Sequence, residues 1–217
     1  MAKIASWICV EEIVKIIKAS YVIDLIEEPL EMLKRIERAG RVCYKSEDKI
    51  TDTSYVDMIK RLIKSAHHSV LEHGIISVKF ITDRGILAEL TRHRIASFSA
   101  ESSRYCNYSK DKFGNEITFI QPDFKLSPQD EYLLFQIEKH YLNRLADGLS
   151  PQQARYFLPN GLKTEIVMTC NLREWRHIFL LRTSPKAHPQ MRELMIPLLQ
   201  DFKDLIPIVF YDIEVAG

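Results

Sequence analysis

The sequence is poor in glycine and has none of the glycine spacings that bind phosphate groups. Seven glycines occur among 217 residues, and no two of them are separated by a single residue. The Gly-x-Gly-x-x-Gly dinucleotide loop and the Walker loop are therefore both absent. If the protein binds a dinucleotide, side chains rather than a glycine-rich backbone must hold its phosphates.

Cysteine and long apolar runs are also scarce. The four cysteines, Cys9, Cys43, Cys106 and Cys170, form no Cys-x-x-Cys pair and match no zinc module. Such usage is typical of a reducing compartment. No apolar run approaches the ~18 residues of a membrane span, and the N-terminus has no signal-peptide cleavage pattern. We therefore expect a cytoplasmic protein with no membrane partner.

An excess of charge of one sign is missing as well. The formal net charge is +1, and the chain is 46% hydrophobic and 27% charged, as in an ordinary globular protein. A general nucleic-acid binder would usually carry a basic surface field. We expect no nucleic-acid partner, and any anion site must come from local clustering.

Such a cluster lies between Arg92 and Tyr108. It begins with Arg-His-Arg, continues through several serines and contains a further arginine, Arg104, beside aromatic residues. Arginine offers a planar fork of donors that suits phosphate and carboxylate oxygens. From composition alone, the same stretch could also be a solvated basic loop.

Periodicity and capping residues predict alternating strands and helices. Strands are expected at 14–26, 74–82, 117–120 and 163–170. Helices are expected at 29–39, 52–66, 83–94, 127–147, 150–158, 171–182 and 190–210, the last interrupted by Pro197 and Pro207. We predict that Gly40 ends the first helix and that residues 113–116 form a hairpin turn. Residues 1–13 are expected to be an extension, and 14–217 a single domain.

A histidine-rich segment raises the question of a metal site. His67, His68 and His73 lie within seven residues of one another together with Glu72. Histidines at a helix end also serve as caps and dipole partners, and neither a cysteine nor a second carboxylate is nearby. We predict no metal.

The order of residues in the basic cluster resembles the signature of flavin-dependent thymidylate synthases: Arg-His-Arg, seven residues, Ser102, one residue, Arg104. Further matches follow in the family's order from about residue 40 to 192. They are His67-x-Ser69, Arg155 before Leu-Pro, Asn171-x-Arg173, and Arg182. The chain departs from the family pattern at Glu89, where members often carry a glutamine or another polar residue, and at Ala100, a position that is acidic or amide-bearing in some members. It also departs in the spacing after Arg182.

The resemblance implies an α+β fold with a central, mostly antiparallel sheet flanked by helices, assembled as a homotetramer with active sites between subunits. It implies reductive methylation of dUMP to dTMP. Methylenetetrahydrofolate supplies the carbon, NADPH the electrons, and FAD carries the hydride. The flavin supplies the difficult chemistry, so no protein nucleophile is required.

The resemblance also implies roles for individual residues. Arg182 is expected to be catalytic and to stabilise negative charge on the uracil ring as N3–H ionises. The residues expected to bind FAD are Ser69, Arg92, His93, Arg94, Ala100, Asn171, Arg173 and His177. Those expected to bind dUMP are Glu89, Arg92, Ser102, Ser103, Arg104, Arg155 and Arg182.

Three alternatives remain open. Ser102 or Cys106 could be a covalent nucleophile, although neither has a base partner fixed by sequence. Arginines interleaved with aromatics also suit a single-stranded nucleic-acid-binding module. A nucleotide-binding flavoprotein with other redox chemistry would share most of the same residues.

Overall fold

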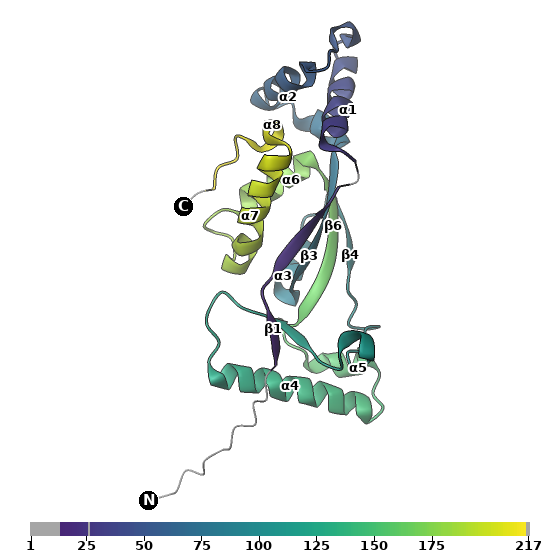
Figure 1. Cartoon of the computed structure of the whole chain (residues 1–217), viewed down its shortest axis with the longest axis vertical. Coiled ribbons are helices and arrows are strands. Elements are labelled where there is room, and N and C mark those ends of the chain that lie inside the picture. Colours follow the sequence, from purple (N-terminus) through teal and green to yellow (C-terminus); the bar gives the residue numbers. More distant parts are fainter. Residues whose placement is uncertain (1–13, 26, 216–217) are drawn as a thin grey trace, which may run out of the picture. The chain divides into compact units, whose positions relative to one another are not determined.

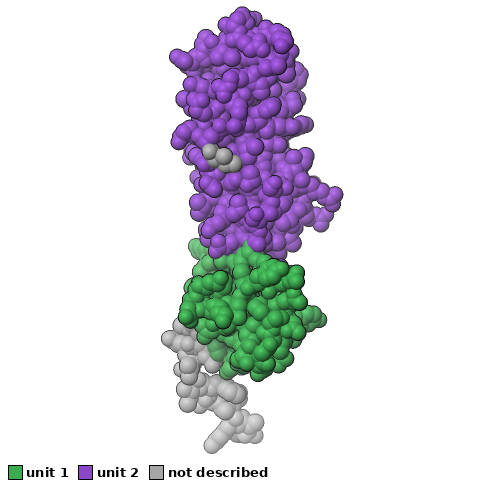
Figure 2. Space-filling model, turned by 90° about the vertical axis from the view of Figure 1, so that its right-hand side faces the viewer, with its two compact units in different colours: residues 1–18, 101–163 green, residues 19–100, 164–217 purple. Residues whose placement is uncertain are grey.

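The computed structural model describes residues 14–25 and 27–215. The predicted extension, 1–13, lies outside the described residues. Contacts divide the chain into two compact units (Figure 2). Unit 1 comprises the described residues up to Lys18 together with Glu101–Lys163, and unit 2 comprises Ala19–Ala100 together with the chain from Thr164 onward. The boundaries of the predicted domain, 14–217, stay a prediction.

Unit 2 is built on a four-stranded sheet with the strand order β2-β3-β6-β4 (Figure 1). The strands are β2 (Ser20–Asp24), β3 (Ile75–Asp83), β4 (Ala96–Ala100) and β6 (Lys163–Asn171). β2 pairs antiparallel with β3, and β4 pairs antiparallel with β6. Side chains alternate along β6 between buried and half-buried, as expected for a strand with one face on a core.

Helices provide the other side of this core. They are α1 (Pro29–Val42), α2 (Ser54–Lys64), α3 (Arg84–Leu90), α6 (Leu172–Arg182), α7 (Pro189–Leu205) and α8 (Pro207–Phe210), with short 3-10 helices η1 (Glu47–Lys49) and η2 (His68–His73). An aromatic cluster of Trp175, Phe179, Phe202 and Phe210 joins α6, α7 and α8, and all four side chains are fully buried. The indole Nε1–H of Trp175 donates to the carbonyl of Ile76 at 3.1 Å. This bond fixes α6 against β3.

Unit 1 has its own smaller core. β1 (Lys15–Ile17) pairs parallel with β5 (Thr118–Ile120), and the helices are α4 (Pro128–Ala146) and α5 (Pro151–Ala154), with 3-10 turns η3 (Asp111–Phe113) and η4 (Arg155–Phe157). Phe119, Tyr141 and Leu162 are among its buried residues. None of the helices among the described residues combines the length and apolar character needed to cross a membrane.

The capping predictions at Asp83, Ser127 and Gly148 are confirmed, whereas Thr53 precedes α2 without a side-chain cap hydrogen bond. The Asp83 carboxylate accepts from the Ile86 N–H at 2.8 Å and starts α3, and Ser127 with Asp130 forms a capping box at α4. Gly148 follows α4 with φ of 93°, the left-handed conformation that glycine adopts without strain. Short-range hydrogen bonds decide these boundaries, so they can be predicted locally.

Several element predictions are wrong or incomplete. The helix expected at 83–94 is α3, which ends at Leu90, and the helix expected at 150–158 is α5 followed by η4. The expected strand 14–26 is two strands, β1 and β2, which belong to different sheets. Gly40 lies inside α1 rather than ending it, and a Cβ there would lie 2.6 Å from Cε of Met58, so close packing with α2 explains the glycine. Residues 113–116 do turn, with Gly114 and Asn115 at positive φ, but β5 pairs with β1, so no hairpin forms. Strand β4 was not expected within the basic cluster.

The predicted α+β class is confirmed at the level of a mixed helix and sheet fold with an antiparallel sheet. The single chain leaves the homotetramer a prediction.

Candidate functional site

The site in unit 2 is organised by helix α6. The Asn171 side chain accepts from the Glu174 N–H at 2.8 Å, which caps the helix at the end of β6. The helix then presents Arg173 and His177 to solvent, buries Glu174 against the core side and ends at Arg182. One capped helix thus carries several of the predicted site residues.

A pocket of about 420 Å³ opens beside the start of α6. Residues from η2, from the segment before β4 and from α6 line it: His68, Glu72, Ile95, Asn171, Arg173, Glu174, Arg176, His177 and Leu180. The Arg173 guanidinium pairs with the Glu72 carboxylate at 2.6 Å, with both side chains about half exposed. An exposed pair of this kind stabilises weakly, so Arg173 can exchange Glu72 for an anionic ligand.

Arg182 is held at the other end of α6 by three hydrogen bonds. Its Nε–H donates to Nε2 of His93 at 3.0 Å, and its terminal nitrogens donate to the carboxylate and the carbonyl of Glu89 at 2.8 and 3.1 Å. The side chain is 18% exposed. The fold therefore brings Arg182 into contact with Glu89 and His93, which lie about 90 positions earlier in the sequence.

His93 is buried, and its surroundings keep it neutral. Its exposed fraction is 6%, and its Nδ1 lies 3.4 Å from the Glu174 carboxylate. Burial, followed by the positive charge of Arg182 and by His177, lowers the pKa of His93 from 6.5 to about 4. The two histidine rings lie edge to face with centroids 6.3 Å apart.

The flanking members of the Arg-His-Arg trio have a different environment. Arg92 and Arg94 follow the end of α3 and are exposed, and neither forms a salt bridge within the ranges that the structure describes. Ser69 is exposed on η2, and Ala100 is exposed as the last residue of β4. The trio therefore lies beyond the helix, with His93 buried and both arginines exposed.

A possible metal-binding geometry occurs at residues other than those considered from sequence. The ligand atoms of His93, Glu174 and His177 lie within 4.8 Å of one another. His93 already uses Nε2 for Arg182, which leaves only Nδ1 for an ion. The histidines at positions 67, 68 and 73 do not belong to this group.

A second group of predicted residues lies in unit 1. Nη1 of Arg155 donates to the hydroxyl of buried Ser103 at 3.4 Å. The Ser102 carbonyl accepts from the backbone N–H groups of Tyr105 and Cys106, which closes a turn around Arg104. Arg104 is exposed, and its guanidinium lies 5.2 Å from the centroid of the Tyr105 ring. Hydroxyl and guanidinium donors thus converge on one short loop.

Glu101 anchors this loop, a role that the sequence analysis missed. Its carboxylate accepts from the Tyr108 hydroxyl at 2.7 Å and from the Lys163 ammonium at 3.1 Å, and its side chain is 12% exposed. Burial and the Glu101 carboxylate raise the pKa of the Cys106 thiol. A thiol whose pKa is raised forms little thiolate, which counts against Cys106 as a nucleophile.

Glu174 and Glu72 were also missed. Asn171 and Glu174 have the spacing of a capping box, so local pattern alone favours a structural role for Glu174. Glu72 stands in the histidine-rich segment, where it suggested metal ligation rather than a partner for Arg173. No local signal identifies either contact, because each joins segments that are distant in the sequence.

Comparison with known proteins identifies the family. The family model described as Thymidylate synthase complementing protein matches residues 24–208. The flavin-dependent thymidylate synthase of Mycobacterium avium (strain 104) is 36% identical over 203 residues, covering 83% of this chain and 79% of that protein. The chain belongs to the flavin-dependent thymidylate synthase family. The family predicted from the Arg92–Arg104 motif is therefore confirmed.

Other relatives and a solved structure agree with this assignment. The flavin-dependent thymidylate synthase of Geobacter sulfurreducens is 30% identical over 183 residues, covering 80% of this chain and 78% of that protein. The crystal structure of a UMP/dUMP methylase, PolB from Streptomyces cacaoi, bound with 5-Br dUMP, has a TM-score of 0.68 at 23% identity. That match covers 91% of this chain and 96% of PolB, and it shows that the two chains share a fold.

Proposed function

We propose that this chain catalyses the reductive methylation of dUMP to dTMP through the residues described above. As a member of the flavin-dependent thymidylate synthase family it is a methyltransferase that uses FAD, with NADPH as reductant and methylenetetrahydrofolate as carbon donor. The observation that carries the residue assignment is Arg182, held at the end of α6 by Glu89 and His93.

The side chains of this site can hold FAD, although the chain has no glycine-rich phosphate loop. Exposed Arg92 and Arg94 are available to its phosphates, and Arg173, Asn171 and His177 line a pocket with an apolar wall. We assign these five residues, with Ser69, His93 and Ala100, to FAD. When bound, the flavin supplies the hydride transfer, and the protein supplies binding and orientation.

The dUMP assignment rests on two kinds of donor. Ser102, Ser103, Arg104 and Arg155 bind the phosphate, since hydroxyl and guanidinium groups converge at their loop. Arg182 faces the uracil ring and stabilises negative charge there as N3–H ionises, because a guanidinium stays protonated at neutral pH. Glu89 and Arg92 also contact the nucleotide in this proposal.

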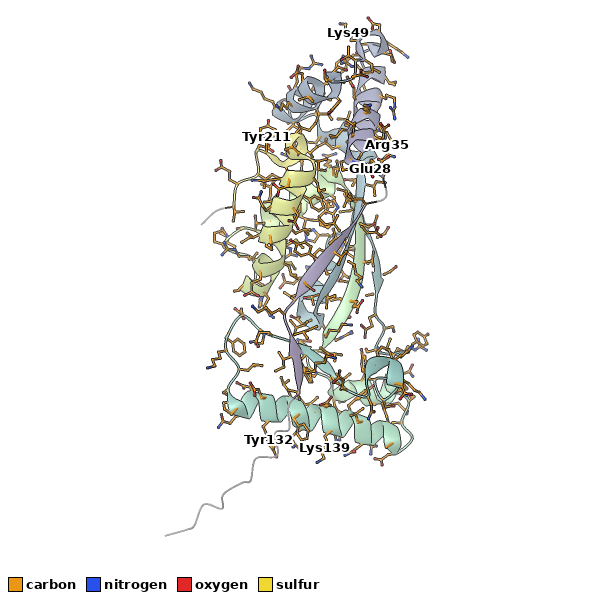
Figure 3. The ribbon with its side chains drawn as sticks, viewed as in Figure 1. Glu28, Arg35, Lys49, Tyr132, Lys139 and Tyr211 are labelled. Carbon is orange, nitrogen blue, oxygen red and sulfur yellow. The ribbon has the colours of Figure 1, made fainter. Side chains whose placement is uncertain are left out.

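We further propose a homotetramer in the cytoplasm with active sites between subunits. Large apolar side chains are exposed in both units. On α4 the exposed fractions are 60% for Tyr132 and 59% for Leu133, and on α6 the exposed fraction of Leu180 is 57%. Tyr132 is labelled in Figure 3. Surfaces of this kind suit burial in an assembly. Light scattering should give four times the mass of one chain, and FAD should dissociate on dilution. Stoichiometric FAD on a monomer would contradict the assembly proposal.

The deciding experiment is a dTMP assay. Purified protein should be yellow with bound FAD and should form dTMP from dUMP only when NADPH and methylenetetrahydrofolate are both supplied. Oxidation of NADPH without dTMP would favour a flavoprotein with other redox chemistry. A colourless protein that binds oligonucleotides would favour the nucleic-acid-binding module.

A further inference from the structure

Unit 2 contains a continuous series of polar contacts from a buried acid to the proposed catalytic arginine. The Glu174 carboxylate lies 3.4 Å from Nδ1 of His93, and Nε2 of His93 accepts from Arg182 at 3.0 Å. The opposite edge of Arg182 is held by Glu89. Glu174 and His93 are both less than a tenth exposed, so the first half of this series is shielded from water.

The direction of the Arg182 bond fixes the proton on the imidazole. A guanidinium can only donate, so Nε2 of His93 must carry the lone pair. The neutral ring then has its proton on Nδ1, which lies 3.4 Å from the Glu174 carboxylate. A carboxylate near Nδ1 favours a proton there, so Glu174 and Arg182 favour the same tautomer of His93.

We propose that His93 is a positioning residue that acts through Arg182, rather than a residue that binds the flavin through its ring nitrogens. Glu174 supports this role by favouring the tautomer that accepts from Arg182. Both ring nitrogens already face protein partners in the structure. The inference rests on the proposed role of Arg182 and refines the FAD assignment of His93 given above.

Orientation matters because an arginine side chain is long and flexible. Fixing Nε–H on one side and the terminal nitrogens on the other leaves one N–H on each terminal nitrogen for a ligand. A positioned donor stabilises developing charge without reorganising during the reaction. His93 orients the Nε–H side of Arg182, and the more exposed Glu89 orients the terminal nitrogens.

Burial and the positive charge of Arg182 favour the neutral form of His93, whereas the nearby Glu174 carboxylate favours the charged form. Arg182, His177 and Glu174 face His93 from α6, and Glu89 of α3 contacts Arg182. Burial and the positive charge of Arg182 lower the pKa of His93 to about 4. At the pH of an ordinary assay His93 is therefore an acceptor toward Arg182, as the inference requires.

Substitutions at His93 separate positioning from flavin binding. His93→Phe keeps a ring but removes both nitrogens, and should lower kcat by about 10- to 100-fold, the range for losing one hydrogen bond to a charged group. His93→Gln retains an acceptor and should recover much of that loss. FAD stoichiometry and affinity should stay within about 3-fold of wild type in both variants, as in the control His140→Phe, an exposed histidine outside the site.

A second readout does not depend on activity. In ¹⁵N spectra of histidine-labelled protein, His93 should give the neutral Nδ1–H tautomer between pH 5 and 8, and Glu174→Gln should shift the tautomer balance toward Nε2–H. A charged His93 or an Nε2–H tautomer in the wild type would overturn the inference, whether or not the variants fold.

The outcomes distinguish this inference from the function on which it rests. If wild-type protein forms no dTMP, the proposed function is wrong. If wild type is active but His93→Phe retains full kcat, or loses FAD in proportion to its activity, the positioning role is wrong.

Discussion

The two halves of the motif between Arg92 and Arg104 have different surroundings, although only seven residues separate them. In the first half, His93 is buried and belongs to a charge network that ends at Arg182. In the second half, Ser102–Arg104 forms a turn that Glu101 anchors from its flank. The first belongs to unit 2 and the second to unit 1. In the function proposed above, the first half orients Arg182 and the second half binds an anion.

Among the substitutions that test this comparison, Arg182→Lys should have the largest effect on activity. Lysine keeps the charge but cannot contact His93 and both acceptors of Glu89 with one planar group. We expect kcat for dTMP formation to fall by about 10²- to 10³-fold, as for removal of a positioned charge-stabilising donor. FAD absorbance and dUMP binding by calorimetry should remain.

The matched control is Arg144→Lys, since Arg144 is an exposed arginine paired with Asp147 on α4. It should leave kcat unchanged. Wild-type kcat in Arg182→Lys would mean that Arg182 contributes only charge.

The buried His93 predicts a pH dependence of stability that the second half of the motif lacks. In the folded protein the pKa of His93 is lowered from 6.5 to about 4. Between these two pH values the unfolded chain therefore binds a proton at His93 and the folded chain does not. Stability from this group is complete above pH 6.5 and is lost as the pH falls toward 4, by up to roughly 3 kcal/mol. Urea unfolding at pH 7 and pH 4 measures it.

The comparison variant for this measurement is His93→Phe. It should lose less stability between the two pH values than wild type does. Equal losses in the two proteins would place the acid sensitivity elsewhere.

Glu101→Gln should weaken the anion-binding half selectively. The substitution keeps the shape but removes the charge that holds Tyr108 and Lys163. We expect KM for dUMP to rise by about 10-fold, the cost of weakening hydrogen bonds that involve a charged group. FAD affinity should not change, and a shared loss of FAD would show that the two halves are not independent. Glu116→Gln, an exposed acid in the same unit, is the control.

Arg94→Ala should have the smallest effect, because this side chain is exposed and makes no salt bridge with the described residues. If it contacts a phosphate of FAD, FAD affinity should fall by a few-fold to about 10-fold, and the difference should shrink at high salt. Fluorescence titration of FAD at two ionic strengths measures this. Arg38→Ala on α1 is an exposed arginine control that should leave FAD affinity unchanged.

Local signals predicted much of the secondary structure. Ser127, Asp83 and Gly148 mark element ends through hydrogen bonds or backbone conformations within a few residues. The same reasoning failed at Gly40, because its role depends on Met58 of a neighbouring helix. It also failed for the strand at 14–26, since the pairing partners of β1 and β2 lie far along the chain.

The sequence by itself determined the family, because the long Arg92–Arg104 motif and the matching segments after it keep a specific order of residues. It also determined where most helices begin, since capping is a short-range interaction. Only the tertiary structure decided that His93 is buried between Glu174 and Arg182 while Arg92 and Arg94 remain exposed. The physical reason is that burial and charge pairing depend on segments about 90 residues apart, which periodicity along the chain does not encode.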